Sequence, residues 1–428
     1  MLMQDFDDNW KGSCDQMDIT TGTSTDESVD VVDIPSSREP IPTCTEEQFT
    51  KCIAPFLLQL QEKHMISAST LQIILKEVLH LIEVACDHQK VNLSSLVYKL
   101  ELPVGICKEI ESMLQFNKFL NVTEERIGTE WKRMKLYKKY LKYVAPVPIH
   151  LGIDKQNRLR MAQYTPILDT LRIMLDHNDL LSEVMHPQDQ IPGIFKDARD
   201  GSYFKENKLF MEEENALQIL LYFDEFEVVN PIGYAKKPHK LGAFYFTLGN
   251  MSADKRSSLQ AIQLVLLVYV QDLKVYGFNK VVKPLLEDLH VLENEGVQCG
   301  PVKLRGTVIA LAGDNLASHS ICGFMESFSG SATSTLCRFC NGTRDMMRTN
   351  TPATQFKLRT KADYDKKVEV VSKFPDMSSM YGLKTHCVFN DLKYFHAVTG
   401  LTPDIMHDVL EVVIGYDLCL VIPRMVSE

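Results

Sequence analysis

Two aspartates stand where carboxylates could act on a phosphodiester. Asp224 lies at the end of the apolar run ILLYFD, and Asp314 ends the similar run VIALAGD. Carboxylates at the ends of strands in a mixed sheet can converge on one edge, where two of them can share two Mg²⁺ ions and align the attacking and leaving oxygens. Most aspartates at strand ends are turn or cap residues, so the spacing alone leaves both interpretations open.

A second candidate is a pair of cysteines. Cys337 and Cys340, in the segment CRFC, have the spacing that lets two thiolates bind one tetrahedral Zn²⁺. The residues that could complete such a site are His386, Cys387, His396 and His407. Free structural thiols and thiol redox chemistry are the alternatives, and redox chemistry is disfavoured because no thioredoxin-like βαβ pattern surrounds the motif.

A third candidate is the segment DIMHDVLE. If it is helical, His407 and Glu411 lie one turn apart on the same face, with Asp408 beside them. One face could then present a zinc-binding imidazole and a magnesium-binding carboxylate. The alternative is an ordinary helix start that is capped by Thr402 or Asp404.

The segment WKRMKLYKKYLKY, residues 131–143, combines basic and aromatic side chains and contains no acid. Basic residues neutralise phosphates and aromatic faces stack on bases, which is typical of nucleic-acid contact. The alternative is a helix with a solvated basic side and an aromatic side that packs on a core. The candidate DNA-binding residues are Lys132, Arg133, Lys135, Lys138, Lys139 and Lys142.

These residues need elements to position them. Helical spacing of apolar residues predicts helices over 47–120, with Ser67 or Ser69 as an N-cap, and again over 158–221. From residue 218 onward, the short apolar runs QILLYFDEFEVV, HKLGAFYFTLGN, SLQAIQLVLLVYV and VKLRGTVIALAG predict strands, and NKVVKPLLEDLHVLENEG predicts a helix. Strands followed by alternating helix and strand predict a mixed α/β layer.

The charge is concentrated in an N-terminal tail. The chain has 428 residues and a formal net charge of −10, and residues 1–47 hold 12 of its 56 acidic residues but only two of its 46 basic ones. Residues 1–46 have too little apolar surface to offset chain entropy, so we expect a disordered acidic tail. The tail is either a solvated segment without a task or an interaction or phosphorylation segment, and the remaining charges cancel.

Composition excludes several classes of protein. Hydrophobic residues make up 45% and charged residues 24%, as in globular proteins. No apolar run approaches about 18 residues, so no membrane span is predicted. The 11 cysteines form an odd number without regular spacing, which favours reduced thiols and an intracellular protein. The sequence contains neither a phosphate-binding GxxxxGK[ST] loop nor a GxSxG elbow.

The order of the motifs resembles a known family. YFDEFEVVNPIG, HKLGAFYFTLGN, LLEDLHVLENEGV, ALAGDNLASHSICGF, LCRFC and DIMHDVLEVV follow one another as in the transposases of CACTA-type (En/Spm-like) DNA transposons and their animal relatives. The resemblance covers about residues 160–420. It implies an RNase H-like core with a DDE/D triad and a zinc-binding insertion.

The resemblance also implies roles for single residues. Asp224 and Asp314 match the first two acids, and Glu411 is the candidate for the third, with Asp408 as runner-up. In the insertion, zinc would be bound by Cys337, Cys340 and His407, with His396 as the further candidate ligand. The triad would hold Mg²⁺ or Mn²⁺ for attack by water, and later by a 3′-OH, on a transposon-end phosphodiester.

The expected organisation has three parts: a disordered acidic tail (1–46), a helical region with the basic helix (47–157) and an RNase H-like core with the CxxC insertion (158–428). The expected partner is DNA, with no membrane and no small-molecule substrate, and the sequence leaves a homo-oligomer open. The expected location is the nucleus, with the cytoplasm as the alternative.

The chain departs from the family at its C-terminal end. It stops at Glu428, 21 residues after His407, whereas a family transposase continues, so we expect a truncated core. A triad without its supporting elements would not cleave. The alternative function is therefore a non-catalytic nuclear scaffold that binds DNA or another protein.

Overall fold

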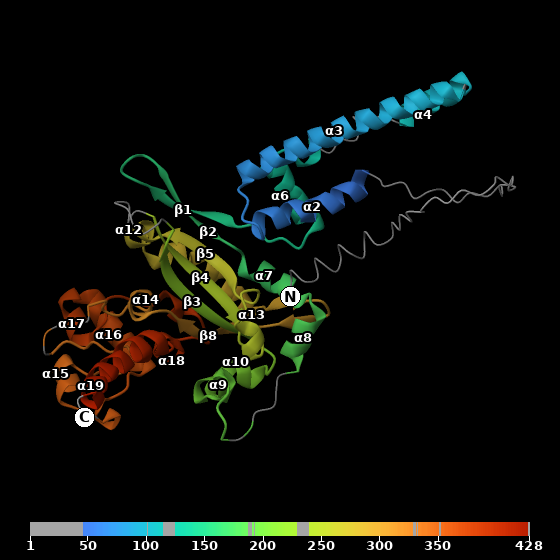
Figure 1. Ribbon diagram of the computed structural model, residues 1–428. Coiled ribbons are helices and arrows are strands. Elements are labelled where there is room, and N and C mark those ends of the chain that lie inside the picture. Colours follow the sequence, from blue (N-terminus) through green and yellow to red (C-terminus); the bar gives the residue numbers. More distant parts are fainter. Residues whose placement is uncertain are drawn as a thin grey trace. The chain divides into compact units, whose positions relative to one another are not determined.

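The computed structural model describes residues 46–100, 102–113, 125–186, 191, 193–228, 239–327, 331, 333–350 and 352–426 (Figure 1). The chain forms two compact units, Met1–Ala145 and Pro146–Glu428. The boundary lies before the expected break at 157/158, because strand β1 belongs to the sheet of the second unit. The predicted acidic tail lies outside the described residues, except that Glu46 begins a helix. In the described part of the chain, no helix is both long and apolar enough to cross a bilayer.

The first unit is helical, as predicted for this region. Its helices are α2 (Glu46–Glu62), α3 (Ala68–Lys99), α4 (Val104–Met113) and α6 (Glu130–Tyr140). The predicted cap at Ser67 is confirmed, since its hydroxyl accepts a hydrogen bond from the backbone N–H of Thr70 at 3.1 Å. Leu57 of α2, Leu71 and Leu75 of α3, and Tyr137 of α6 form a small buried core.

The second unit is built on a six-stranded mixed sheet, which confirms the α/β prediction. The strand order is β1-β2-β5-β4-β3-β8. The strands are β1 (Val147–Ile153), β2 (Leu159–Tyr164), β3 (Leu217–Glu227), β4 (Lys240–Leu248), β5 (Gln263–Tyr269) and β8 (Gly306–Ala312). All neighbouring strands are antiparallel except β3 and β8, which are parallel. A separate hairpin pairs β6 (Val297–Cys299) with β7 (Val302–Leu304).

The helical prediction for 158–221 is wrong at both ends. Residues 159–164 form β2, and β3 begins at Leu217. The misleading residue is Tyr164, which fits a helical repeat with the residues that follow it. It lies at the end of β2, and its hydroxyl donates to Asp288 at 2.6 Å and accepts from the backbone N–H of Ile167 at 3.2 Å, so it fixes the start of the next helix to α13.

Helices and short turns connect and cover the strands. They are α7 (Ile167–Leu175), α8 (Asn178–Met185), η1 (Ala198–Asp200), α9 (Ser202–Glu206), α10 (Lys208–Glu212), α11 (Ala253–Arg256), α12 (Val270–Val281), α13 (Lys283–Asn294), α14 (Asn315–Ile321), α15 (Arg344–Thr349), η2 (Ala353–Gln355), α16 (Lys361–Lys373), η3 (Pro375–Met377), α17 (Ser378–Tyr381), η4 (Val388–Asp391), α18 (Ala397–Gly400), η5 (Met406–Ile414) and α19 (Gly415–Val426). The proline within the predicted 279–296 helix stands in the first turn of α13, where a missing N–H costs nothing.

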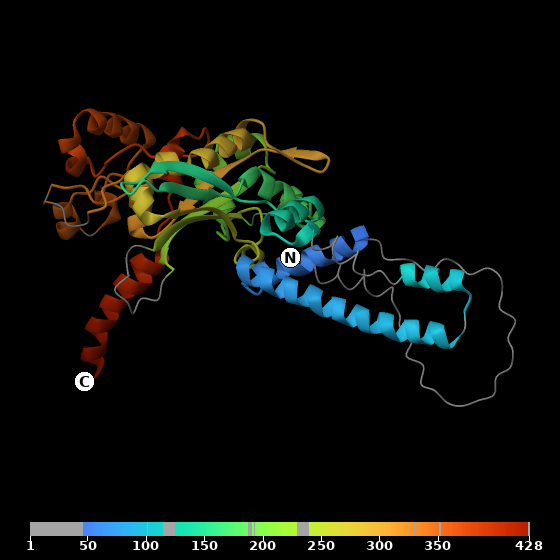
Figure 2. The same ribbon diagram turned by 90° about the horizontal axis from the view of Figure 1, so that it is seen from above.

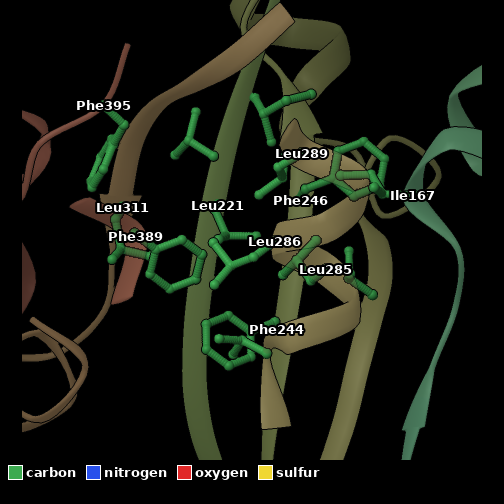
Figure 3. Packing of buried hydrophobic residues seen from close by; sticks show 14 of the residues in the cluster. Ile167, Leu221, Phe244, Phe246, Leu285, Leu286, Leu289, Leu311, Phe389 and Phe395 are labelled. Atoms are coloured by element: carbon green, nitrogen blue, oxygen red, sulfur yellow. The ribbon is translucent and has the colours of Figure 1, made fainter. Parts of the chain in front are cut away.

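The main core lies on one face of this sheet. Leu285, Leu286 and Leu289 of α13 pack over Leu221 of β3 and Phe244 of β4 (Figure 3). Successive residues of a strand point to opposite faces, so the residues on either side of Leu221 lie on the other face. There Leu220 packs on a smaller cluster formed by α9 and α10.

Candidate carboxylate site at the ends of β3 and β8

The two aspartates singled out by the sequence lie at equivalent positions of neighbouring parallel strands. Tyr222 of β3 pairs with Ala312 of β8, and Asp224 and Asp314 each follow two residues later. The chains still run side by side beyond that pair, because a Cβ added at Gly313 would lie 3.0 Å from the carbonyl oxygen of Phe223. The structure therefore brings the two carboxylates to one end of the sheet.

An extra residue in β8 determines which residues of β3 and β8 lie opposite each other near the site. Ile219 pairs with Val308, but the next residue, Leu220, pairs with Ala310. Ile309 is thus the additional residue of a β-bulge, and it shifts the alternation of β8 by one position relative to β3. After the bulge, Leu220 and Ala310 share the face of the smaller cluster.

The bulge decides on which face Asp314 lies. With the pairing that holds before the bulge, Asp314 would be in register with Glu225, whose side chain belongs to the opposite face from that of Asp224. With the bulge, the register continued beyond Tyr222 and Ala312 sets Asp314 opposite Asp224, which shares the face of Tyr222 away from the main core.

Tyr222 lies close enough to the carboxylates of this region for their charges to act on its hydroxyl. Burial raises the pKa of the Tyr222 hydroxyl, and the negative charges of Asp224, Asp404 and Asp314 raise it further. The carboxylates of Asp224 in β3 and of Asp314 after β8 also make local hydrogen bonds: Asp224 accepts the backbone N–H of Glu225 at 2.8 Å, and Asp314 caps α14 by accepting that of Ala317 at 2.6 Å.

The segment DIMHDVLE is attached beside β8 and is helical, as predicted. Leu401 forms an isolated parallel bridge with Leu311, which carries the chain to the same end of the sheet. Asp404 then begins the helix, because its carboxylate accepts the backbone N–H of His407 at 3.1 Å and its carbonyl accepts that of Asp408 at 2.8 Å. The capping role suggested for Asp404 is therefore confirmed.

Asp404 and His407 form an ion pair. A hydrogen bond from the ring to Asp404, together with the negative charges of Asp404, Glu411 and Asp314, raises the pKa of His407. Burial alone would raise the pKa of Asp404, but hydrogen bonds from the backbone and ring of His407 bring it below its usual range. Three nearby carboxylates therefore favour the protonated form of His407.

The two candidates for a third acid differ in their surroundings. Asp408 is engaged within the protein: its Oδ1 accepts from the amide of Asn315, and its Oδ2 lies 3.6 Å from Nη2 of Arg338. Glu411 is exposed and lies near enough to His407 for its charge to raise that pKa. This arrangement favours Glu411 over Asp408 as a carboxylate that could turn to a ligand.

The donor atoms at this end of the sheet suit a hard cation, since carboxylate oxygens are the ligands that Mg²⁺ prefers. Within the described residues, however, no three or more His, Cys, Asp or Glu side chains are grouped closely enough to hold a metal ion. The structure therefore pairs Asp224 with Asp314 and leaves the third ligand unassembled.

The CRFC segment lies in a turn after α14, between bridges that join Thr335 to Thr343 and Cys340 to Leu358. Both sulfurs accept backbone N–H groups, Cys337 from Phe339 at 3.3 Å and Cys340 from Gly342 at 3.4 Å. Burial raises the pKa of Cys340, and the hydrogen bond from the Gly342 N–H opposes this rise.

The expected zinc set is not brought together among the described residues. His396 accepts the backbone N–H of Val398 at 3.1 Å and places its other ring nitrogen 3.2 Å from Asp365. His407 is paired with Asp404, as described above. Cys387 is a buried free thiol that interacts with the thiol of Cys322. The two thiols of CRFC fit half of a zinc site.

The basic segment forms α6 and the residues after it, and its members differ sharply. Arg133 is buried, and its Nη1 donates to the side chain of Gln72 at 2.7 Å and to the carbonyl of Ile127 at 3.1 Å. Its prediction as a DNA contact is therefore corrected: it holds α6 against α3. The other five candidates are partly or fully exposed: Lys132, Lys135, Lys138, Lys139 and Lys142.

Aromatic rings accompany the exposed lysines. Nζ of Lys135 lies 3.7 Å from the ring centroid of Trp131, and that of Lys139 lies 4.6 Å from the ring of Tyr140. Tyr137 points into the core instead. The structure therefore shows a helix with one side packed on the core and a basic side that is exposed, and contact of that side with nucleic acid stays a prediction.

Sequence reasoning missed two residues of this region. Asn315 and Arg338 contact Asp408, although neither was a candidate. Their signals were local: Asn315 directly follows Asp314, and Arg338 stands inside CRFC.

Neither protein-family models nor curated protein sequences provide a match to this chain.

Proposed function

We propose that this protein is derived from a CACTA-type transposase and that it cleaves and joins DNA phosphodiesters with divalent cations. The finer fold belongs to the same proposal. Three antiparallel strands (β5, β4, β3) followed by the parallel strand β8 are in the order of an RNase H-like core, with β1 and β2 added at one edge. The bridge at Leu401 extends that order beyond β8.

The observation that carries the proposal is the register of Asp224 and Asp314. Carboxylates at the same level of adjacent parallel strands are donors of the kind that phosphoryl-transfer sites use, and the charge of a third carboxylate, Asp404, acts on the same Tyr222 hydroxyl. An aspartate that only caps a turn would not require a second aspartate at the same level of the neighbouring strand.

In this proposal Asp224 and Asp314 would hold Mg²⁺ or Mn²⁺, with Glu411 as the third carboxylate. A cation bound there supplies activation of the attacking oxygen and stabilisation of the leaving one. The chain's own contribution is to fix Asp314 through the α14 cap and to place His407 near the acids. Cys337 and Cys340 would contribute two ligands to zinc, and no step depends on that ion.

DNA would be held by the exposed lysines of α6 and the following residues, with the nucleus as the site of action. Lysines that neutralise backbone phosphates release counterions, so this contact is independent of sequence and weakens with salt. The rings of Trp131 and Tyr140 lie beside Lys135 and Lys139, and aromatic faces of this kind are suited to stacking on unpaired bases.

The second candidate function is a non-catalytic scaffold that binds DNA or another protein. It is favoured by one observation: in the described part of the chain no three ligands are gathered for a metal. A fold that kept its paired aspartates without a third ligand would bind DNA and leave it intact.

Nicking and strand-transfer assays with Mg²⁺ or Mn²⁺ test the proposal. We expect Asp314→Asn to lower cleavage by at least about 100-fold, because it removes the charge that a cation requires. Asparagine is as good an N-cap as aspartate, so α14 should keep its cap and the fold should persist. DNA binding should be unchanged.

The matched control is Asp345→Asn, on an exposed residue of α15, which should cleave like the unchanged protein. Cleavage that survives both Asp314→Asn and Asp224→Asn would rule out this site. Binding without cleavage by the unchanged protein would favour the scaffold.

A further inference from the structure

Three polar side chains from segments far apart in the chain contact one another in a closed network. Nη1 of Arg338 donates to Oδ1 of Asn315, Nδ2 of Asn315 donates to Oδ1 of Asp408, and Nη2 of Arg338 lies 3.6 Å from Oδ2 of Asp408. We call these residues the Arg338 network. It joins the CRFC turn, the start of α14 and the helix η5.

The guanidinium of Arg338 is nearly excluded from water. Its side chain is 5% exposed, and Nε and Nη2 have no hydrogen-bond partner. A buried cation needs an opposite charge, and Asp408 supplies one from a side chain that is 39% exposed. The ring of Phe339 lies 4.7 Å away and covers part of the guanidinium.

The helix that Asp408 belongs to has little other anchorage. Met406, Val409 and Leu410 on η5 are 55%, 41% and 55% exposed, and Leu418, Leu420, Val421 and Ile422 on α19 are similarly exposed. In Figure 2 the red helix leaves the sheet and ends at the C-terminus. Apolar packing therefore does not fix the rotation of η5, and the polar network is positioned to do so.

We propose that Arg338 and Asp408 are positioning residues that hold η5 against the loop carrying Asp314. The role of this positioning in cleavage rests on the proposed function. Asn315 is the residue after Asp314, and Glu411 lies three residues after Asp408 on the same π-helix, so the network sets the separation between the second acid and the candidate third acid. It also assigns Asp408 a role other than that of a ligand.

The test is amide hydrogen exchange of the intact chain without added metal. Arg338→Met keeps an apolar stem against Phe339 and leaves Asp408 able to hydrate. We expect amides of residues 404–411 to exchange about tenfold faster or more, while those of β3 and β4 stay protected. Arg348→Met, on the exposed end of α15, is the matched control and should exchange like the unchanged protein.

Asp408→Asn provides a second variant that retains an acceptor for Asn315. It should loosen the same residues, and the double variant should add little to either single change, because both act through one contact. Exchange in 404–411 that matches the unchanged protein in both variants would overturn the inference. So would an equal increase throughout the sheet, which would mean a general loss of stability.

The exchange result separates this inference from the proposed function. If the unchanged protein does not cleave DNA, the nuclease proposal fails, but the exchange of 404–411 still shows whether the network holds the helix. If it does cleave, Arg338→Met should raise the Mn²⁺ concentration for half-maximal cleavage by about tenfold. A shift of that kind is expected from a ligand that is held less firmly.

Discussion

At the scale of the residue, similar side chains in this protein have different tasks because their surroundings differ. Arg133 and Lys135 are neighbours in the same basic helix, yet one is a buried structural donor and the other is exposed beside Trp131. Asp408 and Glu411 are three residues apart on the π-helix η5, yet only Asp408 is engaged by an arginine and an amide. Sequence spacing cannot separate the members of such pairs.

The buried imidazole of His319 leads to a prediction of how the stability of the protein depends on pH. Burial lowers the pKa of His319, the charges of Arg338 and Arg359 lower it further, and a 2.7 Å contact with the carbonyl of Met325 opposes the shift. A depressed pKa means that the folded protein favours the neutral ring. Its contribution to stability is therefore complete above the ordinary pKa of about 6.5 and is lost as the pH falls through the folded pKa.

We expect the melting temperature of the unchanged protein to fall more between pH 7.5 and 5.5 than that of His319→Gln, as measured by scanning calorimetry. Glutamine cannot gain a proton in this range, and it can still donate to the Met325 carbonyl. His64→Gln, at an exposed position, should retain the full pH dependence. Identical pH dependence of His319→Gln and the unchanged protein would contradict the prediction.

At the scale of the element, a buried glutamate fixes the segment that leads to the site. Glu293 of α13 is fully buried and accepts from the hydroxyl of Thr307 and from the backbone N–H groups of Lys393 and Tyr394, at 2.5, 2.8 and 3.2 Å. It thereby joins α13, β8 and the segment before α18. That segment continues to Leu401 and then to η5.

We expect Glu293→Gln to lower the free energy of unfolding by about 2 kcal/mol, because the amide nitrogen cannot accept and a buried N–H is left facing a donor. Urea unfolding at neutral pH measures this change. The control is Glu287→Gln on the exposed side of the same helix, which should change stability by less than about 0.5 kcal/mol. Equal effects of the two substitutions would show that the backbone contacts do not depend on the carboxylate.

At the scale of the whole molecule, the charge of the first unit and the carboxylates of the second belong to separate compact bodies. The proposed function needs both, one to hold DNA and the other to act on it. Substitution of the lysines in the first unit should therefore leave the core of the second unit intact, and substitution of the carboxylates should leave the core of the first unit intact.

Salt dependence gives the prediction at this scale. Replacing Lys135, Lys138 and Lys139 with alanine should flatten the slope of log affinity for duplex DNA against log salt by about 3, since each phosphate contact contributes about 0.9. Fluorescence anisotropy over a salt series measures it. Lys76, Lys90 and Lys108, exposed elsewhere in the first unit, form the control set, and alanine there should leave the slope unchanged. An equal loss from both sets would indicate general attraction and no defined contact surface.

The sequence alone determined the four long strands of the sheet that follow residue 216 and the helical character of the first unit. Alternating and helical patterns are local, so they identified β3, β4, β5 and β8, the helices of the first unit, and the cap at Ser67. They also placed Asp224 and Asp314 at strand ends. They failed over β2, where Tyr164 fits a helical repeat with the residues after it although it ends a strand.

The tertiary structure decided the rest, because those features depend on contacts between residues far apart in the chain. The bulge at Ile309 shifts one strand against its partner, and hydrophobic patterning does not encode that register. Burial of Arg133 by α3 and capture of Asp408 by Arg338 are likewise long-range events. Alternation of apolar and polar residues predicts the face of its own strand on which a residue lies. Only the packing of distant segments determines which residues it contacts there.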